Sequence, residues 1–189
     1  MSRPDEDDQR SSGMSRPDKD DPSFPAALPG LRRGDFSRLK PLFEGGDHCR
    51  IVEWHRLGLF DGEPEALAEA FSCACFLGKT EVAEYLLDRD VDPLAGAGTG
   101  MNAFHWAANR GQLETVEMLI RRGVPLEIRN SYGGTVLGAA VWAAIHEPKP
   151  AHLAIIEALL RAGANRDEAE YPTRNAAVDE ALRGDEKKV

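Results

Sequence analysis

The chain has 189 residues, 42% of them hydrophobic, and a formal net charge of −9 at pH 7, which suits one domain with a continuous apolar core. The acidic balance argues against nucleic-acid binding, because phosphate contacts need a basic surface, and no apolar run is long enough to predict a membrane span. Three cysteines, an odd number, and an N-terminus without an apolar signal core indicate reduced thiols in a cytoplasmic protein.

The first 22 residues are expected to form a disordered acidic tail. They are rich in Asp, Arg, Ser and Pro and have too few apolar side chains to offset the entropy of folding. Residues 1–5 recur as residues 14–18, which fits either a tandem duplication or a start at Met14. A linear binding motif in this tail is the alternative to a purely solubilising role.

A period of 33 residues organises the centre of the chain. Residues 73–87 match residues 106–120 in the spacing of small, Gly and Leu positions, with Gly78 and Gly111 33 residues apart. A third copy begins in the same register, but its terminal Gly163 lies 40 residues after Gly123, which places an insertion of seven residues around 146–150. A period of this length predicts stacked helix pairs.

A weaker copy at 34–46 precedes these three, with eleven extra residues before the next copy. The sequence therefore predicts an all-α solenoid of about four to five stacked helix-turn-helix repeats with short finger turns. In chain order the expected elements are a degenerate repeat at 23–47, an insertion at 48–66, repeats at 67–99, 100–132 and 133–172, a C-terminal cap at 173–183 and a tail at 184–189.

Apolar residues at helical spacing mark the second helix of each pair. They are Leu113, Val116, Leu119 and Ile120 in one repeat, and Leu153, Ile156, Leu159 and Leu160 in the next. Gly123 and Gly163 are expected to end these helices in the left-handed conformation. A closing helix over the last apolar face is predicted from Asn175, Ala176, Val178, Ala181 and Leu182, because terminal repeats need a polar outer face.

Two motifs resemble those of ankyrin repeats. Residues 102–111 are similar to the Thr-Pro-Leu-His-x-Ala-Ala-x-x-Gly helix start, and residues 159–164 to the Leu-Leu-x-x-Gly-Ala helix end. The resemblance covers roughly residues 23–183. It implies that His105 forms a hydrogen bond to the backbone of a neighbouring loop, and that the chain binds another protein.

The resemblance also implies a partner-binding concave face, formed by the two residues before each inter-helix Gly and by the finger turns. Carried over to this sequence, the positions are Phe76, Leu77, Thr99, Met101, Asn109, Arg110, Arg129, Ser131, Tyr132 and Trp142. Several are Phe, Tyr, Trp, Met or Arg, types found at interface hot spots. The alternative is that some of them, Phe76 and Trp142 above all, are buried under the insertions.

Other residues suggest chemistry less clearly. Cys73 and Cys75 lie two positions apart, so on a helix they point away from each other and are expected to pack in the core. His48, Cys49 and His55 lack a fourth ligand at zinc-site spacing. We therefore expect no metal and no cofactor.

The leading hypothesis is a monomeric cytoplasmic adaptor or inhibitor that binds another protein through its concave face, with no nucleic-acid or membrane partner and no enzyme activity. One alternative is a metal- or thiol-dependent enzyme that uses His146, Glu147 and His152 of the insertion at 146–152. The other alternative is a structural module of a larger complex.

Overall fold

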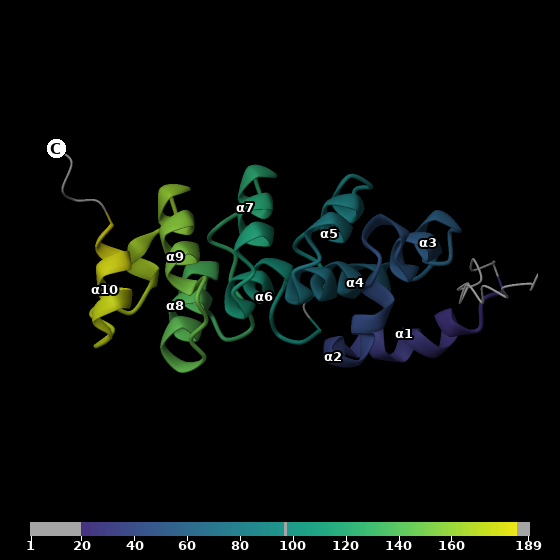
Figure 1. Cartoon of the computed structure of the whole chain (residues 1–189), viewed down its shortest axis with the longest axis horizontal. Helices are drawn as coiled ribbons and strands as arrows, with labels where there is room; N and C mark the ends of the chain where they lie inside the picture. The colour runs from purple at the N-terminus through teal and green to yellow at the C-terminus, as the bar shows by residue number, and fades with distance from the viewer. Residues whose placement is uncertain (1–19, 97, 185–189) are drawn as a thin grey trace, which may run out of the picture.

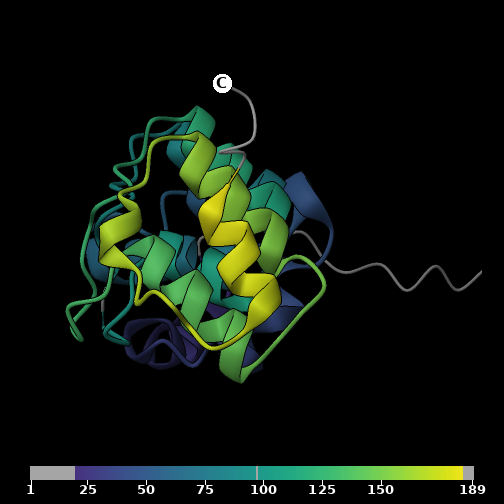
Figure 2. The same ribbon diagram turned by 90° about the vertical axis from the view of Figure 1, so that its left-hand side faces the viewer.

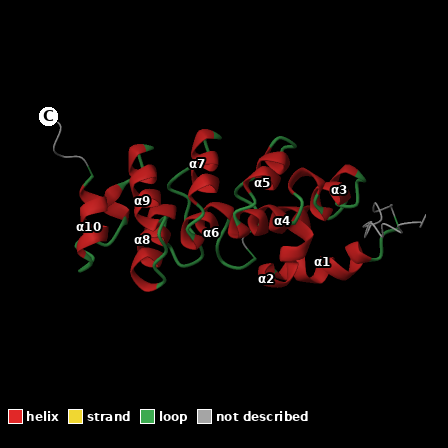
Figure 3. Ribbon diagram, in the orientation of Figure 1, coloured by secondary structure: helices red, strands yellow, loops and turns green. Residues whose placement is uncertain are grey.

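The computed structural model describes residues 20–96 and 98–184, and all regular structure in those residues is helical (Figure 3). The expectation of an all-α solenoid is confirmed. Residues 1–19 of the expected N-terminal tail and 185–189 of the expected C-terminal tail lie outside the described residues.

Three helix pairs form the body of the solenoid. They are α4 (Pro64–Leu77) with α5 (Thr80–Leu87), α6 (Ala103–Arg110) with α7 (Leu113–Arg121), and α8 (Val136–His146) with α9 (His152–Arg161). Helices α4, α6 and α8 pack in succession as an inner row, and α5, α7 and α9 form an outer row beside them (Figure 1). Because α6 and α8 begin 33 residues apart, the repeat register predicted from the sequence is present in the structure.

Local signals explain where these helices begin and end. The side chains of Asn102 and Thr135 accept hydrogen bonds from backbone N–H groups in the first turns of α6 and α8, as N-cap residues do. Gly111 follows α6 with φ of 73°, in the left-handed region that glycine adopts without strain. Gly123 and Gly163 have φ of 71° and 99° just after α7 and α9, so their predicted role is confirmed.

The N-terminal end of the solenoid departs from this pattern. It contains α1 (Ser23–Arg33), α2 (Phe36–Leu39), the 3₁₀ turns η1 (Lys40–Phe43) and η2 (Gly46–His48), and α3 (Arg50–Arg56). Helix α1 packs against α4, and α3 packs against α5, η1 and η2. Helix α3 thus lies within 48–66, the segment expected to be an insertion, and extends the outer row (Figure 1).

Asp21, inside the segment expected to be a tail, is bound to this end of the fold. Its carboxylate accepts a hydrogen bond of 2.8 Å from the indole Nε1 of Trp54 on α3. Trp54 itself is fully buried. The contact ties the chain just before α1 to the outer row.

At the other end, η3 (Arg166–Glu168) and α10 (Ala176–Arg183) follow α9. Helix α10 packs on α9 and α8 and buries Val178, Ala181 and Leu182. Viewed along the long axis, this helix lies across the end of the stack, and the turns between repeats project together on one side (Figure 2). One apolar core runs the length of the molecule, from Phe24 to Leu182.

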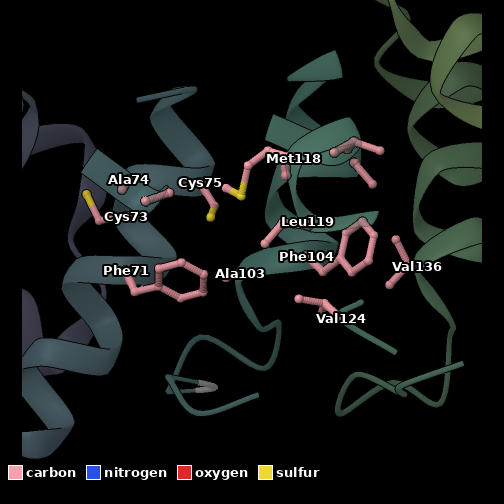
Figure 4. Close-up of a cluster of buried hydrophobic side chains, with 14 of the residues drawn as sticks. Phe71, Cys73, Ala74, Cys75, Ala103, Phe104, Met118, Leu119, Val124 and Val136 are labelled. Carbon is pink, nitrogen blue, oxygen red and sulfur yellow. The ribbon is translucent and has the colours of Figure 1, made fainter. Parts of the chain in front are cut away.

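The core between α4 and α6 is built from equivalent positions of consecutive repeats. Phe71 and Phe104 are both fully buried and follow one another along the stack, with Ala103 between them (Figure 4). Cys73 and Cys75 are also fully buried, with sulfur atoms pointing in different directions (Figure 4), which confirms the packing prediction. Burial raises the pKa of both thiols, so neither is a reactive thiolate.

The predicted apolar stripe of α9 is wrong at one of its four residues, Leu153, while Ile156 and Leu159 are buried as expected. Leu153 is 37% exposed, whereas His152 is only 1% exposed and lies on the buried face with Ile155, Ile156 and Leu159. A histidine occupies this interior position because both of its ring nitrogens find hydrogen-bond partners there. Apolar periodicity alone does not detect such partners.

Candidate protein-binding face

One face of the molecule is formed by α4, α6 and α8 together with the turns that precede α6 and α8. We call it the inner-helix face, and the turns at 92–102 and 125–135 finger 1 and finger 2. The ten residues that the sequence singled out for partner binding come from these helices and turns.

Hydrogen bonds from the inner helices hold the fingers in place. The Ser72 hydroxyl donates to the Gly96 carbonyl oxygen of finger 1 at 3.0 Å. One repeat later, His105 Nε2 lies 3.1 Å from the Gly134 carbonyl oxygen of finger 2, which confirms the hydrogen bond expected of His105. Consecutive fingers are also joined, since the Ser131 N–H donates to the Gly100 carbonyl oxygen at 2.9 Å.

Three aromatic rings cluster at the N-terminal end of the inner-helix face. The ring centroids of Phe36, Phe76 and Trp106 are 5.2 to 6.0 Å apart in edge-to-face geometry. Trp106 Nε1 donates to the Thr99 hydroxyl oxygen of finger 1 at 2.9 Å. Edge-to-face packing adds to the free energy of apolar burial, so α2, α4, α6 and finger 1 are held together by this aromatic cluster.

Arg110 extends the cluster toward α8. Its guanidinium carbon lies 4.7 Å from the Phe76 ring centroid, in the range of a cation–π interaction. Arg110 also lies near a carboxylate, with 3.9 Å between Arg110 Nη1 and Glu147 Oε2. The next aromatic group is Trp142, 49% exposed, whose ring stacks on His146 with centroids 4.7 Å apart.

The insertion between α8 and α9 folds back on the C-terminal end of α6. Lys149 Nζ donates to the Arg110 carbonyl oxygen at 2.9 Å, and His152 Nε2 lies 3.0 Å from the Asn109 carbonyl oxygen. The Lys149 N–H donates to His152 Nδ1 at 3.1 Å. The two final carbonyl groups of α6 thereby gain donors, as helix ends require.

These contacts favour the neutral form of the His152 imidazole. Its Nδ1 accepts and its Nε2 donates, and burial lowers its pKa. Both nitrogens are occupied by main-chain groups, which leaves neither free to move a proton in a reaction. The interpretation that this insertion carries catalytic histidines has no support from the geometry of His152.

The structure divides the predicted binding residues into three groups. Arg129, Ser131, Tyr132 and Trp142 are exposed, Tyr132 by 82%. Asn109 is buried. The remaining five are half-buried and lie at or near the aromatic cluster: Phe76, Leu77, Thr99, Met101 and Arg110.

Sequence reasoning missed two members of the aromatic cluster, Trp106 and Phe36. Trp106 is half-buried and occupies the repeat position of the fully buried Cys73. A tryptophan is too large for a cysteine-sized core position, and this mismatch was the signal that its ring must reach the surface of the stack. Phe36 had no comparable signal, because it comes from α2, outside the regular repeats.

The possible metal ligands do not form a site. Cys49 is buried, the imidazole of His48 pairs with Asp47, and His55 Nδ1 lies 3.2 Å from the Tyr85 hydroxyl. Among residues 20–96 and 98–184, no group of three or more His, Cys, Asp or Glu side chains is arranged to hold an ion. In the same part of the chain, every helix is too short or too polar to cross a lipid bilayer.

Comparison with known proteins identifies the family. A family model described as ankyrin repeats, in three copies, matches residues 70–170, more than half of the chain. The crystal structure of EF0377, an ankyrin repeat protein, is similar in fold with a TM-score of 0.51 at 18% sequence identity, covering 84% of this chain and 96% of that one. No curated protein sequence matches the chain. With its stacked helix pairs and its matched repeats, the chain belongs to the ankyrin-repeat family, whose repeats are generally protein–protein interaction modules.

Proposed function

We propose that this chain is a monomeric cytoplasmic adaptor or inhibitor, without enzyme activity, that binds another protein through its inner-helix face and fingers. The observation that carries the proposal is the row of incompletely buried side chains along three consecutive inner helices. Phe76 comes from α4, Trp106 and Arg110 from α6, and Trp142 from α8. Trp and Arg are the residues most enriched among interface hot spots.

The way the fingers are held supports the same proposal. Finger 1 receives hydrogen bonds from Ser72 and Trp106, and finger 2 lies within hydrogen-bond distance of His105. A surface fixed before binding loses less conformational entropy when the partner arrives. The exposed Tyr132 at the end of finger 2 is thus presented from a turn whose backbone is already positioned.

Site-specific photocrosslinking in the native host tests this function. A photoreactive phenylalanine analogue replaces Tyr132 in one variant, Trp142 in a second, and the exposed outer-row residue Glu117 of α7 in a control. We expect the first two variants to crosslink to the same protein, and the Glu117 variant not to do so. Crosslinks from Glu117 alone, or none from the inner-helix face, contradict the proposal.

A further inference from the structure

Arg110 has an unusual position on the inner-helix face. Its guanidinium lies over the Phe76 ring and its side chain is 36% exposed. Phe76 also packs against Trp106 in the aromatic cluster, and on the next inner helix, α8, Trp142 stacks on His146. Glu147, whose Oε2 lies 3.9 Å from Arg110 Nη1, directly follows His146 of that second aromatic pair in the chain.

The contact between Arg110 and Glu147 is loose. At 3.9 Å the two groups are too far apart for a hydrogen bond, and the Glu147 side chain is 52% exposed. An exposed ion pair of this kind contributes little to stability. The Phe76 ring, 4.7 Å from the guanidinium carbon, provides no oxygen acceptor for the N–H groups of Arg110. A guanidinium binds a carboxylate through two parallel hydrogen bonds.

The surroundings of Arg110 are cationic although the chain as a whole has a net charge of −9. Lys149 binds the Arg110 carbonyl oxygen and so brings a second positive charge to the end of α6. Burial lowers the pKa of Lys149, and the positive charge of Arg110 lowers it further. Two cations thus face one weakly held carboxylate, Glu147.

We propose that Arg110 recognises a carboxylate of the partner, and that the partner presents it on an extended acidic segment with aromatic or aliphatic residues on either side. The partner's carboxylate takes the guanidinium edge in place of Glu147. Its apolar neighbours lie against Trp106 and Phe76 on one side and against Trp142 on the other. This inference rests on the proposed function and adds the chemistry of the bound segment.

The test is a selection of random 12-residue peptides displayed on phage against the immobilised full-length chain at low salt. Synthetic versions of the enriched peptides are then titrated against the wild-type chain and four variants, Arg110→Gln, Arg121→Gln, Glu147→Gln and Trp142→Ala. Arg121 is the matched control, because it is the last residue of the outer helix α7 as Arg110 is of the inner helix α6. Lys149 binds the main chain at residue 110, so Arg110→Gln keeps that hydrogen bond.

We expect enriched peptides to carry Asp or Glu beside aromatic or aliphatic residues. Arg110→Gln should weaken their binding about tenfold or more, the loss of one charge-assisted hydrogen-bonded pair. Arg121→Gln should leave binding within about twofold, because Arg121 belongs to the outer helix α7 and contributes only a long-range attraction that solvent and salt screen. Glu147→Gln should strengthen binding, because it removes the competing carboxylate. Higher salt should weaken binding to the wild-type chain and change binding to Arg110→Gln much less.

Three results overturn the inference. They are a selection that yields no excess of acidic residues, an Arg110→Gln variant that binds as the wild type does, and equal losses from Arg110→Gln and Arg121→Gln. If the peptides bind Arg110→Gln as tightly as the wild type but lose affinity for Trp142→Ala, the inference of an acidic segment is wrong and the proposed function is still supported. A selection without any binder, combined with no crosslinks from Tyr132 or Trp142, removes both.

Discussion

Two departures from the regular repeat flank the α6–α7 pair, and each buries one titratable side chain against the main chain of a neighbouring element. On the N-terminal side, α4 begins early and places Glu69, 4% exposed, beside finger 1. On the C-terminal side, the lengthened α8 and the insertion place His152, 1% exposed, against the end of α6. Both groups are buried, but they differ in how many of their polar side-chain atoms have hydrogen-bond partners.

His152 has a partner for each ring nitrogen, whereas Glu69 has a partner for one carboxyl oxygen. The Gly98 N–H of finger 1 donates to Glu69 Oε1 at 2.8 Å, and Glu69 Oε2 is buried without a hydrogen-bond partner. In the next two repeats this position holds Asn102 and Thr135, which cap their helices. Because α4 continues for a further turn toward its N-terminus, Glu69 lies in the helix interior and cannot act as a cap. The neutral imidazole fits its site, and the charged carboxylate does not.

The largest expected effect comes from breaking the matched site. His152→Ala removes a buried ring and leaves the Asn109 carbonyl and the Lys149 N–H without partners. We expect the free energy of unfolding to fall by about 2–5 kcal/mol, as for truncation of a large core side chain. Urea denaturation followed by circular dichroism measures this value. His146→Ala, in the same insertion but exposed, should change it by no more than about 0.5 kcal/mol, and similar losses from both variants would show that His152 does not hold the insertion.

Substitution of Glu69, whose second carboxyl oxygen has no partner, is expected to raise the free energy of unfolding. Burial raises the pKa of Glu69 above its ordinary value of 4.5, so the folded state disfavours the carboxylate. The corresponding stability is fully present below pH 4.5 and is lost as the pH rises through the folded pKa. Glu69→Gln keeps an oxygen for the Gly98 N–H and does not ionise, so it should be at least as stable as the wild type at neutral pH.

Denaturant midpoints measured from pH 4 to pH 8 check this expectation. The curves of the wild type and Glu69→Gln should converge at the acid end and separate as the pH rises. Glu65→Gln is the control, because Glu65 is an exposed residue in the first turn of the same helix and its substitution should change stability by no more than about 0.5 kcal/mol. A Glu69→Gln variant that is less stable than the wild type at every pH would mean that the carboxylate is stabilised by its surroundings.

Acid should act on the C-terminal site instead. Burial lowers the pKa of His152 below 6.5, so its contribution to stability is present above that pH and is lost as the pH falls through the folded pKa. Protonation would also turn Nδ1 from an acceptor into a donor facing the Lys149 N–H. Burial lowers the pKa of His55 and His105 as well, so a local measurement is needed.

Hydrogen exchange of the backbone amides at 147–152 supplies that measurement. As the pH decreases, the amides at 147–152 should lose protection from exchange before the amides of finger 1 do. The protection factors are corrected for the intrinsic pH dependence of exchange. In His146→Ala the order should be unchanged. If finger 1 loses protection first, the acid-sensitive site is not that of His152, and the expectation is contradicted.

The contrast between the two sites also shows what the sequence can predict. Spacing of 33 residues located α6, α7 and the start of α8. The early start of α4 was missed because its first turn, 64–68, has no counterpart in the other repeats. The burial of His152 was missed because its acceptor, the Asn109 carbonyl, lies 43 residues away in the chain.

The arrangement of side chains on the inner-helix face was predictable only in part for the same reason. Trp142 and Tyr132 could be placed because they occupy positions fixed by the repeat register. The contacts of Phe76 with Phe36, and of Trp106 with Thr99, depend on the irregular N-terminal segment and on finger 1. No periodic signal connects these residues, so only the folded chain shows that they form one cluster.

The smallest expected effect distinguishes the two tryptophans of the inner-helix face. Trp142 is 49% exposed and its ring contacts His146 from the same helix, so Trp142→Ala should change the free energy of unfolding by no more than about 0.5 kcal/mol. Trp106 packs between Phe36 and Phe76 and donates to Thr99, so Trp106→Ala should cost more. Thermal and urea unfolding of the two variants, with Val116→Ala as a buried reference, gives the ranking. If Trp142→Ala destabilises the chain as much as Val116→Ala, the Trp142 indole contributes to folding. The proposed binding surface near α8 would then lack its exposed aromatic residue.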